Sequence, residues 1–99
     1  MKRFLALFLV IMPTTACGGT LYAINASSAN TSLEEAREVG AEELAPYEYY
    51  YAKAHLDQAQ IEASNASYSD AIIYAETAEE YADKAIELSK AARAAGGRK

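Results

Sequence analysis

A stripe of small side chains near the C-terminus constrains the fold of this chain more than any other feature. Its positions follow one another in alternating steps of four and three residues: Ala71, Ala75, Ala78, Ala82, Ala85, Ser89 and Ala92. Such steps give a period of 3.5 residues, the period of a helix that keeps one side against a neighbouring helix. Because small side chains let two backbones approach closely, the stripe predicts a long helix, ending near Ala94, packed against a partner helix.

The complementary helix is predicted immediately upstream, over residues 46–63. Pro46 suits its first position, where the missing backbone N–H costs no hydrogen bond. The residues that share its inner side are Tyr49, Ala52, Leu56, Ala59 and Ala63. The turn that follows, SNAS at 64–67, is so short that the two helices must be antiparallel neighbours.

Capping patterns mark the ends of the helices. Ser67 and Asp70 form a capping box that is predicted to open the long helix. Ser32 and Glu35 form another, which predicts that a short first helix begins at Ser32. The apolar side of this first helix is Leu33, Ala36, Val39 and Leu44. Gly40 is expected to weaken it by about 1 kcal/mol relative to alanine.

The expected fold is therefore all-α. A long antiparallel helical hairpin with a short preceding helix forms one helical domain over residues 32–95. Gly96 and Gly97 are expected to end the long helix. About 60 ordered residues bury little surface, so we expect the monomer to be marginally stable and to associate with itself or a partner.

The first sixteen residues have the composition of an export signal. Lys2 and Arg3 precede an unbroken apolar run, FLALFLVIM at 4–12, and small residues follow up to Ala16. The run is too short to span a bilayer as a helix, which takes roughly 20 residues. We therefore expect residues 1–16 to be a signal peptide.

Cys17 is the only cysteine of the chain, so it cannot close an intramolecular disulfide. TTAC at 14–17 resembles the lipobox of bacterial lipoproteins. The resemblance implies that Cys17 becomes the lipidated first residue of the mature chain, held at the outer membrane facing the periplasm. The alternative is a secreted protein with an unpaired thiol. The residues after Cys17, GGTLYAINASSANT, are small and polar, and we expect 17–31 to be a lipidated cysteine and a flexible tether.

Four tyrosines crowd the start of the helix predicted over 46–63. At about 100° per residue, Tyr47, Tyr50 and Tyr51 form with Ile61 a second stripe that points away from the long helix. In one interpretation the first helix folds back and covers this stripe. In the other, the first helix is too short and leaves a patch that binds a partner helix, a glycan or a second copy. These four residues are the candidate partner-binding residues.

The composition argues against nucleic-acid binding and against most catalytic chemistry. The formal net charge is −5, whereas phosphate contacts need clustered lysine and arginine. His55 is the only histidine, which leaves too few ligands for a histidine-based zinc site or catalytic triad, and we expect it at the solvent edge. The chain has no P-loop, nucleophile elbow or glycine-rich nucleotide turn. We predict no catalytic residues, no metal, no cofactor and no enzymatic activity.

Two segments carry a family resemblance: GAEELAPYEYYYAKAHLDQA at 40–59 and YSDAIIYAETAEEYADKA at 68–85. They resemble a family of short, alanine-rich bacterial proteins known only as a domain of unknown function. That family is often found on lipoproteins, and in some members it precedes an OmpA-like peptidoglycan-binding domain. The spacing of Ala54, Ala59, Tyr68, Ala71 and Ala75 is also similar to one tetratricopeptide unit. The resemblance implies a helical hairpin and specifies no reaction.

The last four residues, GGRK at 96–99, form a short basic tail. A lipid-anchored helical protein that ends in Arg-Lys resembles the major murein lipoprotein, whose terminal lysine is joined to peptidoglycan. The resemblance implies that Lys99 is the attachment residue. The alternative is an ordinary solvated tail.

The expected function is that of a non-enzymatic, membrane-anchored periplasmic lipoprotein. It acts as a helical adaptor or scaffold of the cell envelope, binding a protein partner or itself. Two alternatives stay open: an envelope tether joined to peptidoglycan through Lys99, and binding of a small ligand or glycan by the tyrosine stripe.

Overall fold

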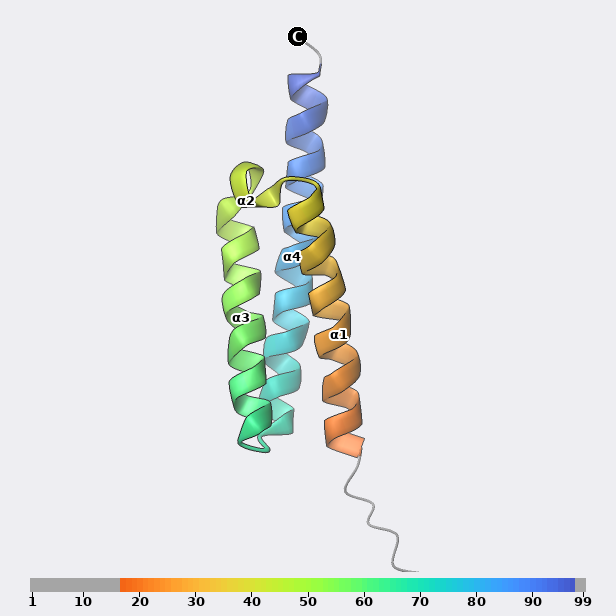
Figure 1. The fold of residues 1–99 in the computed structure, drawn as a ribbon, viewed down its shortest axis with the longest axis vertical. Helices are drawn as coiled ribbons and strands as arrows, with labels where there is room; N and C mark the ends of the chain where they lie inside the picture. Colours follow the sequence, from red (N-terminus) through yellow and green to blue (C-terminus); the bar gives the residue numbers. More distant parts are fainter. Residues whose placement is uncertain (1–16, 98–99) are drawn as a thin grey trace, which may run out of the picture.

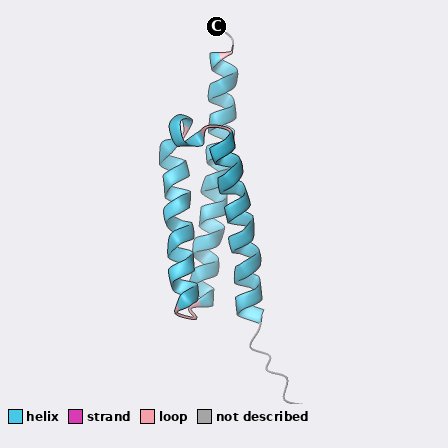
Figure 2. Cartoon of the chain, viewed as in Figure 1, coloured by secondary structure: helices cyan, strands magenta, loops and turns pink. Residues whose placement is uncertain are grey.

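The computed structural model describes residues 17–97, and these form four helices (Figure 1). The helices are α1 (Cys17–Glu38), α2 (Ala41–Leu44), α3 (Pro46–Ser64) and α4 (Tyr68–Gly96). The three long helices lie side by side, and the short α2 connects α1 to α3 at one end (Figure 2). The all-α prediction is confirmed. The predicted signal peptide, residues 1–16, lies outside the described residues.

α4 is the central helix of the bundle. It packs against both α3 and α1, which contact each other much less. α3 runs antiparallel to α4, as predicted, whereas α1 runs in the same direction as α4 (Figure 1). At 1.5 Å per residue, the 29 residues of α4 span about 44 Å, and the helix extends beyond its neighbours at its C-terminal end.

The stripe of small residues forms the contact surface of α4. Its first six positions, Ala71 to Ser89, are fully buried. Tyr49, Ala52, Leu56 and Ala59 are the buried residues of α3, and Ala63 is half-buried. Ala92, which continues the stripe, is exposed because α4 has by then passed the ends of the helices that cover it. The prediction is therefore confirmed for six of the seven stripe positions and wrong for Ala92.

The expected flexible tether is instead the first half of α1, which begins at Cys17. Ser32 lies inside this helix, so the predicted start at a Ser32–Glu35 capping box is wrong as well. The serines, threonines and asparagines of residues 17–31 are weak helix formers in isolation, but tertiary packing overrides propensity. Ala29 is fully buried, and the rings of Tyr22 and Tyr68 lie 6.5 Å apart, centre to centre, across α1 and α4.

The missing side chain of Gly18 eases the close approach of α1 to α4. A Cβ atom at Gly18 would lie 3.3 Å from Cβ of Tyr68, which is tighter than most contacts of real Cβ atoms. At the other end of α1, the ammonium group of Lys90 lies 3.7 Å from the Glu35 carboxylate. Contacts at both ends therefore hold α1 along α4.

Gly40 was expected to weaken the first helix, and this prediction is wrong. Gly40 lies between two helices, α1 and α2. α1 ends at Glu38, and Gly40 has a left-handed φ of 84° just before α2. This conformation, which glycine adopts without steric cost, turns the chain toward α3. Pro46 is the first residue of α3, as predicted.

The turn between α3 and α4 is held by the backbone rather than by a capping box. Ser67 is the N-cap of α4, but its side chain makes no capping hydrogen bond, so the capping-box prediction is wrong. Instead the Ser67 N–H donates to the Glu62 carbonyl oxygen at 2.8 Å, and Ala66 adopts a φ of 60°. α4 then continues to Gly96, two residues beyond the predicted end at Ala94.

Within residues 17–97, none of the helices combines the length and the apolar character needed to cross a membrane.

Candidate partner-binding face

The four residues predicted to bind a partner do not form one surface. Tyr47, Tyr50 and Ile61 are exposed, at 66%, 52% and 52%, whereas Tyr51 is half-buried. Ile61 is separated from Tyr47 by about 21 Å along α3, at 1.5 Å per residue. The structure thus places the tyrosines near the N-terminal end of α3 and Ile61 near its C-terminal end.

α1 does not cover the tyrosines. Its buried residue Leu33 lies with Tyr49 and Leu56 around a 200 Å³ pocket between α1 and α3, on the inner side of α3. The interpretation that the first helix folds over the second stripe is therefore wrong for Tyr47 and Tyr50. The physical reason is that α1 finds its main contact on α4 rather than on α3.

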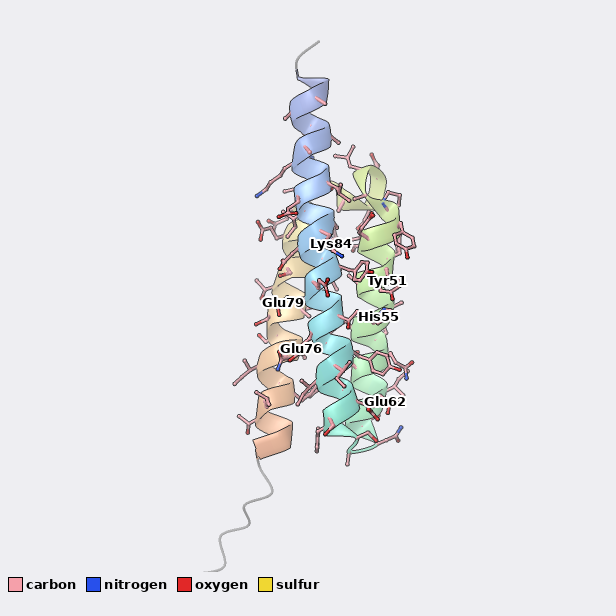
Figure 3. The ribbon with its side chains drawn as sticks, turned by 180° about the vertical axis from the view of Figure 1, so that it is seen from behind. Tyr51, His55, Glu62, Glu76, Glu79 and Lys84 are labelled. Atoms are coloured by element: carbon pink, nitrogen blue, oxygen red, sulfur yellow. The ribbon has the colours of Figure 1, made fainter. Side chains whose placement is uncertain are left out.

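Tyr51 joins a cluster of rings that extends from α3 to α4 (Figure 3). Its ring centre lies 4.1 Å from that of His55, in a stacked arrangement, and 4.2 Å from that of Tyr81 on α4. Tyr47 lies 5.7 Å from Tyr51, and Tyr74 lies 5.9 Å from His55. We call these five residues the ring cluster. It covers one edge of the α3–α4 contact and leads outward to the exposed Tyr47.

Polar groups accompany the ring cluster. The Lys84 ammonium lies 4.5 Å from the centre of the Tyr81 ring and 3.4 Å from a carboxylate oxygen of Glu80. His55 Nδ1 lies 2.9 Å from the carbonyl oxygen of Tyr51. Since a carbonyl oxygen only accepts, Nδ1 carries the proton and donates it. His55 is half-buried, which agrees with its expected place at the solvent edge, and this hydrogen bond fixes the orientation of its ring.

A shallow groove of 280 Å³ adjoins the ring cluster. Ala54, His55 and Gln58 of α3 and Tyr74 of α4 line it. The Gln58 amide donates to the Glu62 carboxylate at 2.9 Å, one turn further along α3. The groove thus offers ring faces together with amide and imidazole groups, which suits stacking and hydrogen bonding.

Tyr49 belongs to the core and not to this face. It is only 7% exposed, and the edge of its ring meets Tyr50 at 5.0 Å between ring centres. Burial raises the pKa of the Tyr49 hydroxyl, and the nearby negative charge of Glu42 raises it further. Tyr49 therefore stays neutral at physiological pH and anchors α3 to the bundle.

Within residues 17–97, no group of three or more His, Cys, Asp and Glu side chains is placed to hold a metal ion.

The two residues predicted to be modified lie at or beyond the ends of the described chain. Cys17, the predicted lipidation site, is the first residue of α1. Lys99, the predicted attachment residue, lies outside the described residues. Because α1 and α4 run in the same direction, Cys17 and Gly96 lie at opposite ends of the bundle (Figure 1).

The sequence did not lead us to predict that His55, Tyr74 and Tyr81 belong to the ring cluster, or that Lys84 lies beside it. One signal was present: ring residues recur at steps of four in Tyr47, Tyr51 and His55, which places them on one side of a helix. Tyr74 and Tyr81 are seven residues apart and lie beside the buried stripe of α4. Their ring partners on α3 can be identified only from the packing of α3 on α4.

The comparison with known proteins identifies the family of the chain. No curated protein and no solved structure matches it. A family model described as a domain of unknown function, DUF4398, matches residues 25–98 and so covers α3, α4 and much of α1. The protein therefore belongs to the DUF4398 family.

Proposed function

We propose that the protein is a non-enzymatic, lipid-anchored adaptor of the bacterial cell envelope that binds a protein partner through the ring cluster and Tyr50. The observation that carries the proposal is the exposure of Tyr47 and Tyr50, which no part of residues 17–97 covers. Large aromatic side chains are enriched among the residues that dominate protein–protein binding energies.

The surroundings of these tyrosines favour a protein partner. Tyr47 rests against Tyr51, which is itself held by Tyr81, so the exposed ring stands on a packed base. A ring held in this way loses little conformational freedom when a partner covers it. Lys84 and Glu80 provide a charged rim on the neighbouring helix.

The likeness to a tetratricopeptide unit points the same way. The α3–α4 hairpin has the antiparallel helix pair of such units, which present binding surfaces for other proteins. A second copy of the chain is the other partner that this face could take.

A lipid on Cys17 would set the location of the face. α1 starts at Cys17 and spans about 33 Å, so Tyr47, at the far end of the bundle, would stand well away from the lipid surface. We propose the outer membrane, facing the periplasm, as this location. Labelling cells with radioactive palmitate tests the anchor: wild-type protein should take up label and Cys17→Ser should not. An unlabelled wild-type protein would contradict the anchor.

The partner-binding proposal is tested by cross-linking in intact envelopes. A photo-reactive residue at Tyr50 should give a discrete cross-linked product, and Tyr47→Ala should reduce its yield roughly tenfold, as expected for loss of a binding hot spot. Lys53→Ala, which changes an exposed side chain on the side of α3 that faces α1, is the matched control and should leave the yield unchanged. Equal yields in both variants would contradict the proposed face.

A second candidate function, glycan binding, is supported by the groove beside the ring cluster. Tyr74 and His55 offer ring faces, and Gln58 offers an amide, which are groups that recognise sugars by stacking and hydrogen bonding. Titration with soluble peptidoglycan fragments tests it: binding heat should disappear in Tyr74→Ala and persist in Tyr50→Ala. Absence of heat with the wild-type protein would remove this candidate.

A third candidate, an envelope tether through Lys99, is supported by the opposite placement of Cys17 and Gly96 in the bundle. A chain anchored in lipid at one end would present its other end to peptidoglycan. Muramidase digestion of purified sacculi should release glycan-bound protein from wild-type cells and none from Lys99→Ala cells. Wild-type protein free of glycan would contradict the tether.

A further inference from the structure

Four large aliphatic side chains are exposed near one end of the bundle. They are Leu21 at 51%, Ile24 at 59%, Ile61 at 52% and Ile73 at 60%. We call them the apolar collar. They come from three helices: the start of α1, the end of α3 and the start of α4. At 1.5 Å per residue, each lies about 5–11 Å along its helix from this end of the bundle.

The three helix ends lie at the same level, so the collar residues occupy one band across the bundle axis. A Cβ atom at Gly18 would touch Tyr68, the first residue of α4, and Tyr22 also meets Tyr68. The end of α3 is joined to the start of α4 by only the turn at 65–67. The ribbon shows the three ends together at the end of the bundle opposite α2 (Figure 1).

This end of the bundle is also poor in charge. Residues 17–33 contain no charged side chain, Glu62 is the only charged residue of 58–67, and Asp70 is the only one of 68–75. The opposite end carries the ion pairs Glu34–Arg37 and Glu35–Lys90. The charge of the molecule therefore changes along the bundle axis, from an end with few charges to an end with several.

We propose that the apolar collar sits in the interfacial layer of a lipid bilayer, so that the bundle stands on the membrane with this end down. The inference deepens the proposed function and rests on its membrane anchor. The chain reaches this end from the membrane in either form: through a lipid on Cys17, or through the apolar run 4–12 if that run is retained. Apolar groups of interfacial helices are buried about 5–10 Å below the surface, which matches the level of the collar.

A lipid layer fits the collar better than a second protein chain does. The collar side chains are exposed on three different helices around the bundle, so a partner on one side would leave the others in water. A stable protein interface needs roughly 800 Å² on each partner in one continuous patch. Lipid headgroups surround the end of the bundle and contact all sides at once. Glu62, which accepts a hydrogen bond from Gln58, and Asp70 then lie at headgroup level.

The test uses tryptophan as a depth probe, because the chain contains none. Full-length Ile24→Trp, Ile61→Trp and Ile73→Trp are reconstituted into phosphatidylcholine vesicles, with or without bromine on the acyl chains. Bromine should cause a roughly twofold loss of emission at all three positions, with a shift to shorter wavelength, as interfacial burial requires. Leu44→Trp and Leu88→Trp, exposed in the opposite half of the bundle, are the controls and should show no loss. Circular dichroism checks that each variant is folded.

Each of the other outcomes would contradict the proposal that the collar sits in a lipid bilayer. Quenching at Ile24→Trp alone would mean that the bundle lies on α1, and no quenching would mean that it is held away from the lipid. The tryptophan emission could also shift to shorter wavelength in detergent without added lipid, to an extent that depends on protein concentration. That result would mean that a second copy of the chain covers the collar. Mass spectrometry of Cys17 on the same samples tests the anchor separately. Quenching of unlipidated protein would keep the collar and overturn the anchor, whereas absence of quenching in lipidated protein would overturn the collar alone.

Discussion

Gly40 lies directly against the side chain of Arg93: a Cβ atom at Gly40 would be 3.0 Å from Arg93 Nη2. The guanidinium is the far end of a flexible side chain and can move aside. The φ of 84° at Gly40 cannot be relieved in the same way, because the whole connection from α1 to α2 depends on it.

Gly40→Ala should therefore destabilise the protein. A non-glycine residue in the left-handed region costs about 1–2 kcal/mol, and we expect a loss of that size in the free energy of unfolding. Urea denaturation followed by circular dichroism measures it. Gly96→Ala is the matched control, since no atom lies within 4 Å of its added Cβ, and it should be neutral or slightly stabilising. An equal effect of both substitutions would show that φ at Gly40 is not the cause.

A helix of this fold could be predicted where its buried residues recur at a regular helical spacing in the sequence. The stripe from Ala71 to Ser89 is fully buried, and its counterpart on α3 is buried at every position except Ala63, so their spacing predicted both helices and their antiparallel packing. In residues 17–31, packing supports the helix: Ala29 is buried in the core and Tyr22 lies against Tyr68 of α4. Their composition is that of a linker, and nothing local in the sequence reveals the contact.

The candidate face was predicted in part for a similar reason. Tyr47 and Tyr50 were found because they lie on the outer side of a predicted helix. The sequence did not determine whether α1 covers these tyrosines, because that depends on whether α1 packs mainly against α3 or against α4. The stacking of Tyr51 on Tyr81 depends on the rotation of α3 against α4, which the spacing of residues fixes only approximately.

The stripe on α4 predicts that the same substitution, alanine to leucine, changes the stability of the fold at one position and leaves it nearly unchanged at another. Ala82→Leu places a large side chain at a fully buried position where two backbones approach, and overpacking of this kind costs about 1–3 kcal/mol. Ala92→Leu makes the same change at an exposed position of the same stripe and should change the stability by less than about 0.5 kcal/mol. Thermal unfolding of the two variants measures the difference. Similar melting temperatures would mean that α3 and α1 do not close on the stripe.

Ser89 is the polar exception in the stripe. It is fully buried, and its hydroxyl is the buried side-chain group of residues 17–97 that lacks a hydrogen-bond partner. A buried polar group without a partner costs about 1–3 kcal/mol, so Ser89→Ala should raise the free energy of unfolding by about 1 kcal/mol. Ser69→Ala, exposed on the same helix, controls for the higher helix propensity of alanine and should change it by about 0.5 kcal/mol or less. A loss of stability in Ser89→Ala would reveal a stabilising contact of the hydroxyl.

The raised pKa of Tyr49 predicts how stability depends on pH above neutrality. Burial is the main cause, and the charge of Glu42 adds to it, so the neutral hydroxyl is favoured in the folded state. A group whose folded pKa is above its unfolded value contributes stability that is complete below the unfolded pKa, about 10 for tyrosine. That contribution is lost as the pH rises through the folded pKa, because the unfolded state then releases the proton more readily.

Stability of the wild-type protein should therefore fall as the pH rises beyond about 10. In Tyr49→Phe this fall should be smaller, since the buried ionisable group is gone, while the aromatic packing in the core is kept. Urea denaturation on both sides of this pH measures the effect. Tyr47→Phe, which removes a hydroxyl from an exposed ring of the same helix, should retain the full wild-type dependence. If Tyr49→Phe and Tyr47→Phe lost stability equally with rising pH, burial of Tyr49 would not be its source.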